Sequence, residues 1–214
     1  MHTECLPPAA LNILRSLKEI VRAHQFVLAG GTAAALHLGH RMSVDFDFFT
    51  ETPFSTDRVF QEIKKTGRTV ETLQEERDTL TVTVDGVKVS FFHVPYPFRE
   101  KRTELNKISV AGMVDIASMK ILAIAQRGSK RDFVDLFFIL QDLPFAKVAE
   151  NMIIRFGKDR INPVVIGKAL VYFSDAETDP EPVYLGKRKE WKLIKKFFLD
   201  HVQQFVLDLD KAKR

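Results

Sequence analysis

The sequence predicts a fold that contains both helices and strands, α/β in the broad sense and α+β in the narrower one. Its first half is expected to form a mixed sheet flanked by helices, and its second half a helical region. Three observations support this prediction. As far as Val94, short runs rich in β-branched and aromatic residues alternate with amphipathic runs. The first apolar run leads directly into Gly30 and Gly31, which indicate a turn between a strand and a helix. From Val114 onward, apolar residues recur at helical spacing.

The first half is expected to contain both helices and strands. Its first helix is indicated by five apolar residues at helical spacing. Thr56 is a candidate N-cap and Gly67 a candidate stop for a later helix. Asp85 and Gly86 separate two strand-like runs and predict a two-residue hairpin. In chain order, we expect helices over residues 8–24, 32–38 and 56–65, and strands over residues 26–29, 44–49, 69–73, 79–84 and 87–94.

The second half has the periodicity of consecutive helices. We expect one helix that begins near Val114, followed by helices over residues 131–140, 145–155, 163–172 and 191–207. Residues 99–107 are polar and separate the two halves, and residues 174–182 are expected to form a loop. We therefore expect a domain over residues 1–108 and a helical domain over residues 109–214, with the active-site cleft between them.

The composition is typical of a globular intracellular protein. Of the 214 residues, 45% are apolar and 28% are charged, which excludes disordered and fibrous classes. Cys5 is the only cysteine, so neither an intrachain disulfide nor a cysteine-based metal site can form. No apolar run reaches the roughly 20 residues of a membrane helix, and residues 1–8 lack a signal-peptide pattern. We therefore expect a cytoplasmic protein that does not associate with a membrane.

The net charge of +4 is concentrated at the C-terminal end. Residues 187–214 contain nine basic and four acidic residues, which gives 9 − 4 = +5 and leaves about −1 for the rest of the chain. Two interpretations remain open. The lysines at positions 192, 195 and 196 either form the solvated face of a helix or guide a polyanion such as tRNA.

The residues after the first predicted strand carry the strongest chemical signal. Asp45 and Asp47 are two apart on a predicted strand, so their side chains point to the same face about 7 Å apart or less. Two carboxylates this close repel each other, so a site in which both are ionised normally contains a cation as well. Mg²⁺ or Mn²⁺ is the natural candidate for this cation. Gly30 and Gly31 let backbone N–H groups approach a phosphate, and the helix that follows offers its positive end.

Each of these features alone has a simpler explanation, because an Asp-x-Asp pair is often a solvated strand edge and a Gly-Gly pair is often only a turn. Together they resemble the signature of the nucleotidyltransferase superfamily. With Arg41 and Ser43 included, the pattern is similar to the AbiEii/AbiGii toxin family of nucleotidyltransferase-like proteins. The resemblance implies that Asp45 and Asp47 bind the metal. It also implies that the nucleotide is contacted by Gly30, Gly31, Thr32, Arg41 and Ser43.

A second block, in the predicted helical half, also resembles this family. It contains Lys120 and an Arg-Asp-x-x-Asp-Leu segment that begins at Arg131. The resemblance implies that Lys120, Asp132 and Asp135 complete the active site. From the residues themselves, Lys120 is the sole charge in an apolar run and either extends to solvent or contacts a phosphate.

The charged residues around that segment also allow two interpretations. Asp132 and Asp135 share a helix face. Either both belong to a surface ion-pair network, or one of them orients Lys120 or accepts a proton from the substrate. In the second case, Lys130 and Arg131 would help to hold the triphosphate.

Ser90 departs from the superfamily pattern. Many polymerase-type nucleotidyltransferases carry a third carboxylate on a strand soon after the Asp-x-Asp pair, and Ser90 occupies the corresponding place in this sequence. Because serine is a poorer metal ligand than a carboxylate, a one-metal reaction and an inactive protein both remain open.

The combined prediction is a metal-dependent nucleotidyltransferase that moves a nucleotidyl group from a nucleoside triphosphate to an acceptor hydroxyl. The resemblance implies a toxin of a toxin–antitoxin or phage-defence pair, with tRNA, another RNA or a protein as the acceptor and an antitoxin as a partner. The alternative is a catalytically inactive module of the same fold that binds a nucleotide or a protein partner.

Overall fold

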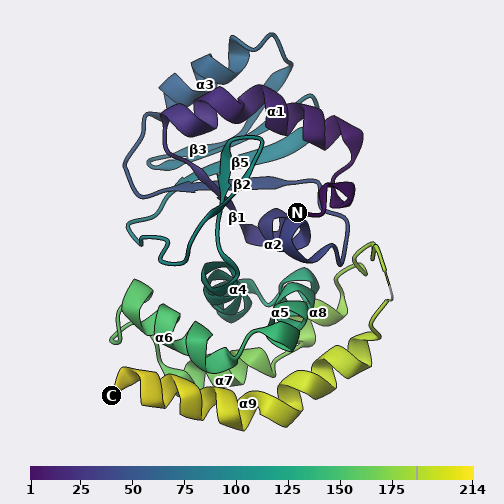
Figure 1. The fold of residues 1–214 in the computed structure, drawn as a ribbon, viewed down its shortest axis with the longest axis vertical. Coiled ribbons are helices and arrows are strands. Elements are labelled where there is room, and N and C mark those ends of the chain that lie inside the picture. Colours follow the sequence, from purple (N-terminus) through teal and green to yellow (C-terminus); the bar gives the residue numbers. More distant parts are fainter. Residues whose placement is uncertain (187) are drawn as a thin grey trace. The chain divides into compact units, whose positions relative to one another are not determined.

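The computed structural model describes residues 1–186 and 188–214, so Lys187, the first residue of the basic C-terminal segment, lies outside the described residues. The chain forms two compact units (Figure 1). The sheet unit comprises Met1–Pro97 and Lys101–Ala111. The helical unit comprises Phe98–Glu100 and Gly112–Arg214. Within the described residues, no helix is both long and apolar enough to cross a membrane.

A mixed sheet of seven strands forms the centre of the sheet unit. The strand order is β3-β4-β5-β2-β1-β7-β6. Strand β2 pairs antiparallel with β1 and parallel with β5, so the predicted mixed sheet is confirmed. The strands are β1 (Val27–Ala29), β2 (Phe46–Thr50), β3 (Val70–Glu76), β4 (Thr79–Val84), β5 (Val87–His93), β6 (Thr103–Leu105) and β7 (Ile108–Val110).

Helices flank this sheet on both faces. Helices α1 and α3 lie side by side on one face, and α2 lies on the other (Figure 1). Helix α3 is capped by the hydroxyl of Ser55, which accepts a hydrogen bond from the Arg58 backbone N–H at 3.2 Å. The predicted N-cap, Thr56, was therefore placed one residue too late. The helices of this unit are the short η1 (Thr3–Cys5), α1 (Pro8–Ala23), α2 (Gly30–Leu38) and α3 (Thr56–Lys64).

The core under α1 and α3 explains why β2 alternates. Phe46 and Phe48 are fully buried, and the Phe48 ring stacks on Phe91 of β5 with a centroid distance of 5.5 Å. Asp47 lies between these rings in sequence and is half-buried. Because successive side chains of a strand point to opposite faces, burial of the phenylalanines directs Asp47 away from the core.

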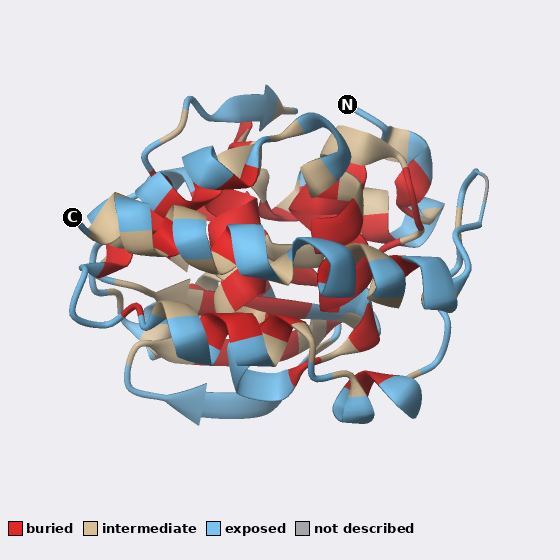
Figure 2. Cartoon of the chain, turned by 90° about the horizontal axis from the view of Figure 1, so that it is seen from below, coloured by how far each residue is buried: buried red, intermediate tan, exposed pale blue. Residues whose placement is uncertain are grey.

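The helical unit contains the helices predicted from periodicity. Its helices carry buried residues on one side and exposed residues on the other (Figure 2). The fully buried rings of Phe133 and Phe198 meet edge to face at 5.4 Å and join α5 to α9. The helices are α4 (Met113–Arg127), α5 (Lys130–Asp142), α6 (Phe145–Phe156), α7 (Pro163–Leu170), α8 (Ser174–Glu177) and α9 (Trp191–Lys213).

Two stretches expected to lack regular structure do contain it. The polar stretch 99–107 includes β6, which turns through Asn106 and Lys107 to pair with β7. Both turn residues have positive φ, at 51° and 68°, but neither is a glycine, so the usual signal of such a turn is missing. The short helix α8 lies in the expected loop 174–182.

Candidate functional site

Asp47 is fixed by strands on both of its sides. It pairs with Ala29 of β1 and with Ser90 of β5. Asp45 lies one residue before β2 and is also half-buried, whereas the intervening Phe46 is fully buried. Within β2 the burial of Phe46 and Phe48 and the half-burial of Asp47 follow the predicted alternation, whereas the strand begins at Phe46 and not at Val44, so Asp45 lies outside it.

Gly30 is required by the close approach of Asp47. Its φ is +67°, a value that side chains disfavour, and a Cβ atom built there would lie 2.7 Å from Asp47 Oδ2. Helix α2 begins at Gly30 and not at Thr32 as predicted, so both glycines belong to its first turn. The residue before the helix, Ala29, has no side chain that could cap it. The turn therefore has no side-chain cap from its N-cap residue, and the start of a helix is a position that suits an anion.

Two buried hydroxyls join the start of α2 to the segment before β2. Thr32 Oγ1 donates a hydrogen bond to the backbone carbonyl of Asp45 and lies 2.7 Å from Ser43 Oγ. A carbonyl oxygen only accepts, so Thr32 is the donor in the first bond and Ser43 must donate in the second. Both hydroxyl protons are used inside the protein. A phosphate contact from either hydroxyl would first require one of these bonds to open.

The remaining two sequence-selected positions in this unit are also buried. Arg41 is 3% exposed, and its Nη1 donates to the carbonyl of Met42 at 2.9 Å. Ser90 is 2% exposed and accepts a hydrogen bond from Thr81 Oγ1 at 3.3 Å. The sheet register confirms that Ser90 is the β5 residue beside Asp47.

The donor set fits a magnesium ion that arrives with a nucleotide. Among residues 1–186 and 188–214, no cluster of three or more His, Cys, Asp and Glu side chains is placed to hold a metal. Mg²⁺ does not need such a cluster, because it commonly takes one or two carboxylates and completes its shell with substrate phosphates and water. Asp45 and Asp47, beside the start of α2, are the residues that could hold such an ion.

A buried cluster of charges lies in the helical unit. Lys120 Nζ on α4 is 2.7 Å from Asp132 Oδ1 and 2.7 Å from Asp135 Oδ2, both on α5. The lysine side chain is 7% exposed, and the two carboxylates are 2% and 0% exposed. We call these three residues the Lys120 triad. Of the open interpretations, a solvent-directed lysine and a surface ion-pair network are both excluded by this burial.

Two further residues organise Asp132. Arg127 Nε lies 3.0 Å from Asp132 Oδ2, and Ser129 Oγ donates to the same oxygen at 3.2 Å. Burial would raise the pKa of Asp132, but the Lys120 and Arg127 charges and their hydrogen bonds outweigh it and leave this pKa below its usual value. No role for Ser129 was predicted from the sequence. The pattern that could have indicated its contact with Asp132 is the spacing of three residues between Ser129, at the N-cap of α5, and Asp132.

Lys130 and Arg131 do not join the triad. Lys130 is 5% exposed, and its ammonium donates to the backbone carbonyl of Asp179 at 2.7 Å. Its backbone N–H also donates to the Asp179 carboxylate at 2.8 Å. Arg131 is exposed on α5. In this arrangement Lys130 fastens the segment around Asp179 to the start of α5.

The lysines of the C-terminal helix have carboxylate neighbours. Lys192 lies 2.9 Å from Glu190, Lys195 lies 2.6 Å from Glu177, and Lys196 lies 2.8 Å from Asp200. These pairs favour the interpretation of a solvated, ion-paired helix face over that of a surface that guides tRNA.

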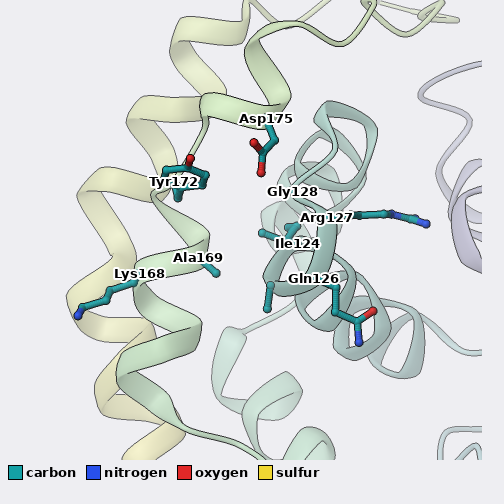
Figure 3. Close-up of a pocket in the computed structure, with 9 residues that line it drawn as sticks. Ile124, Gln126, Arg127, Gly128, Lys168, Ala169, Tyr172 and Asp175 are labelled. Carbon is teal, nitrogen blue, oxygen red and sulfur yellow. The ribbon is translucent and has the colours of Figure 1, made fainter.

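A separate pocket of about 310 Å³ opens at the end of α4 in the helical unit. Figure 3 shows Tyr172 and Asp175 beside this space, while the long Arg127 side chain extends away from Tyr172. The pocket is lined by Ile124, Ala125, Gln126, Arg127, Gly128, Lys168, Ala169, Tyr172 and Asp175.

Comparison with known sequences identifies one family. The family model described as "Nucleotidyl transferase AbiEii toxin, Type IV TA system" matches residues 12–212 and so includes parts of both units. An uncharacterized protein of Aquifex aeolicus (strain VF5) is 40% identical over 187 residues, which cover 86% of this chain and 89% of that protein. The resemblance to this toxin family and the enzyme class expected from the sequence are confirmed.

Solved structures show the same fold. JHP933 from Helicobacter pylori is similar with a TM-score of 0.59, at 18% identity, over 96% of this chain and 95% of that one. MenT4, a nucleotidyltransferase toxin from Mycobacterium tuberculosis H37Rv, is similar with a TM-score of 0.59, at 14% identity, over 95% of this chain and 92% of that one. At these identities the similarity concerns the fold alone, and it confirms the predicted fold class.

Proposed function

The chain belongs to the AbiEii nucleotidyltransferase toxin family, and from this premise we propose that it transfers a nucleotidyl group from a magnesium-bound nucleoside triphosphate to an acceptor hydroxyl. The observation that carries the proposal is the position of Asp45 and Asp47, both half-buried, beside the first turn of α2, which has no side-chain cap.

The sheet unit would bind the metal and the phosphates. Mg²⁺, or Mn²⁺ in its place, would neutralise phosphate charge and orient the α-phosphate for attack. Asp45 and Asp47 would hold this ion. The backbone N–H groups of Gly30 and Gly31 would contact phosphate oxygens at the start of α2. In the reaction, the acceptor oxygen forms a bond to the α-phosphorus, pyrophosphate leaves, and the proton of the acceptor hydroxyl passes to solvent.

The Lys120 triad would serve the same reaction through charge. Two short bonds to Asp132 and Asp135 fix the ammonium of Lys120, and a fixed cation stabilises the charge that develops on the phosphates without reorganising first. We assign the two aspartates to orienting Lys120, because both already contact its ammonium.

For the acceptor, we propose an RNA hydroxyl, with tRNA as the first candidate, and for the biological role a toxin that an antitoxin opposes. The family description supports the toxin role. The acceptor proposal rests on the resemblance described above.

The proposal is tested by transfer of α-labelled ATP, GTP, CTP and UTP onto total RNA and onto protein in the presence of Mg²⁺. Wild type is compared with Asp45→Asn/Asp47→Asn and with a matched control, Glu71→Gln/Glu75→Gln, which neutralises two exposed carboxylates of β3. We expect label on RNA that falls by about 10³-fold in the first variant and is unchanged in the second. Equal labelling by all three proteins would contradict the proposal.

A second candidate function is a nucleotide-binding module without transferase activity. The observation that favours it is Ser90 beside Asp47, where a third metal ligand would otherwise lie. It predicts that a triphosphate binds but that no label is transferred to RNA or protein. A module that binds only a protein partner would bind no triphosphate, and its partner binding would survive alanine at Asp45 and Asp47.

A further inference from the structure

The two candidate metal ligands are held in place by different means. Asp47 belongs to the sheet, with partners on β1 and β5. Asp45 does not. In the described strands, the β2 residue nearest to Asp45 that pairs with β1 is Asp47, opposite Ala29. The β2 residue nearest to Asp45 that pairs with β5 is Phe46, opposite Val89. The backbone that carries the Asp45 carboxylate is therefore outside the ladder on both sides.

Side-chain hydrogen bonds hold Asp45 where the ladder does not. The Thr32 hydroxyl donates to the Asp45 backbone carbonyl, and the Ser43 hydroxyl donates to Thr32 across 2.7 Å. Thr32 is 1% exposed and Ser43 is 9% exposed, so water competes little for these bonds. Together they form one directed chain from Ser43 through Thr32 to Asp45.

This chain attaches Asp45 to the same helical turn that contacts Asp47. Thr32 lies in the first turns of α2, and Gly30 at the start of α2 leaves the space that the Asp47 carboxylate occupies. Helix α2 therefore lies against both residues, through the Thr32 hydroxyl at Asp45 and through Gly30 at Asp47. A displacement of about 1 Å at such a site is enough to reduce catalysis by about 10²-fold.

We propose that Thr32 and Ser43 are positioning residues that set the Asp45 carboxylate for the metal, and that they are not direct ligands of the triphosphate. This inference rests on the proposed function, because it assigns Asp45 to a metal. It replaces the sequence-based expectation that both hydroxyls contact the nucleotide.

The test measures metal affinity separately from turnover. Mn²⁺ binding is titrated by electron paramagnetic resonance on the full chain, with and without a nonhydrolysable ATP analogue, for wild type, Thr32→Val, Thr32→Ser and Ser43→Ala. Loss of a residue that orients a metal ligand typically weakens metal binding or activity by about 10- to 100-fold. We expect that loss in Thr32→Val, a smaller loss in Ser43→Ala, and recovery to within about threefold of wild type in Thr32→Ser.

The kinetic constants distinguish positioning from direct contact. A positioning role predicts that Thr32→Val lowers kcat by about 10²-fold while KM for the triphosphate changes by less than about threefold. The double variant Thr32→Val/Ser43→Ala should be no worse than Thr32→Val, because both residues act through one chain of bonds. The matched control is Thr50→Val, which removes an equally buried hydroxyl at the other end of β2 and should leave Mn²⁺ affinity unchanged.

Three results would overturn the proposal. The first is a Thr32→Val variant with normal Mn²⁺ affinity and a raised KM for the triphosphate. The second is a Thr32→Ser variant whose Mn²⁺ affinity does not recover toward that of wild type. The third is a Thr50→Val variant that loses as much Mn²⁺ affinity as Thr32→Val does. If Thr32→Val does not fold, Ser43→Ala carries the same Mn²⁺ titration. Failure of the proposed function gives a different pattern, because wild type and Asp45→Asn would then bind Mn²⁺ equally.

Discussion

The molecule contains two groups built from a pair of aspartates, and they differ in what balances the charge. In the helical unit, the Lys120 triad places an ammonium 2.7 Å from each carboxylate, and all three side chains are buried. In the sheet unit, Asp45 and Asp47 are half-buried beside a helix N-terminus. In the triad, Lys120 supplies the cation that faces both carboxylates, whereas we propose that Asp45 and Asp47 take a metal ion that arrives with the nucleotide. Burial therefore makes the fold depend more strongly on the charges of the triad, whatever part the triad also plays in the proposed reaction.

The largest expected effect is on the triad. Lys120→Met removes the ammonium that both buried carboxylates contact, and breaking a buried pair in this way lowers the free energy of unfolding by about 3–5 kcal/mol. Urea denaturation measures the change. The matched control is Lys196→Met, because Lys196 also lies 2.8 Å from an aspartate but is 68% exposed. We expect less than about 1 kcal/mol there, and equal losses in the two variants would contradict the role of burial.

The sequence predicted those parts of the fold and of the site that depend on local chemistry. The alternation of Phe46, Asp47 and Phe48 was correct because a strand has a period of two and one face is buried, although the strand begins at Phe46 and leaves Asp45 outside it. The hairpin at Asp85 and Gly86 was correct because both residues adopt positive φ, at 47° and 81°, which this dipeptide favours.

The parts that could not be predicted depend on partners distant in sequence. Thr32 lies 13 residues before Asp45, and no local pattern indicates that its hydroxyl is committed to a carbonyl of that residue. Lys130 was placed with the triphosphate because its neighbours are basic, yet its ammonium meets the backbone of Asp179, 49 residues further on. Polar side chains in both cases find their partners through tertiary packing.

The second prediction concerns Gly30 and separates backbone strain from the contact with Asp47. Gly30→Ala places a side chain at positive φ and against a carboxylate, and we expect a loss of about 1–3 kcal/mol in unfolding free energy together with loss of activity. Gly67→Ala is the control, because Gly67 has a φ of +77° but no atom within 4 Å of an added Cβ. It should show a smaller loss and full activity, and inactivity of both variants would contradict this account.

The third prediction uses acid to test the triad. The pKa of Asp132 is lowered in the folded protein, so its stabilising contribution is present above the unfolded value of about 3.9 and is lost as the pH falls through the folded value. Arg127→Gln removes one cause of this shift, and because Arg127 is 67% exposed we expect only about 0.5–1 kcal/mol at pH 7. Urea denaturation from pH 7 to pH 3 should show the difference shrinking as Asp132 is protonated. A difference that stays constant with pH would mean that Arg127 acts through packing.

The smallest expected effect on the unliganded protein is that of Asp45→Asn, and it completes the comparison with Lys120. Asp45 is half-buried and close in sequence to a second carboxylate, so removing its charge relieves repulsion and should change the unfolding free energy by less than about 0.5 kcal/mol. The difference appears only with ligand. Mg²⁺ and a nonhydrolysable ATP analogue at about 100 times Kd should stabilise wild type by about 2.7 kcal/mol, and Asp45→Asn by much less, in the same denaturation assay. A variant that is strongly destabilised without ligand would show that Asp45, like Asp132, serves the fold first.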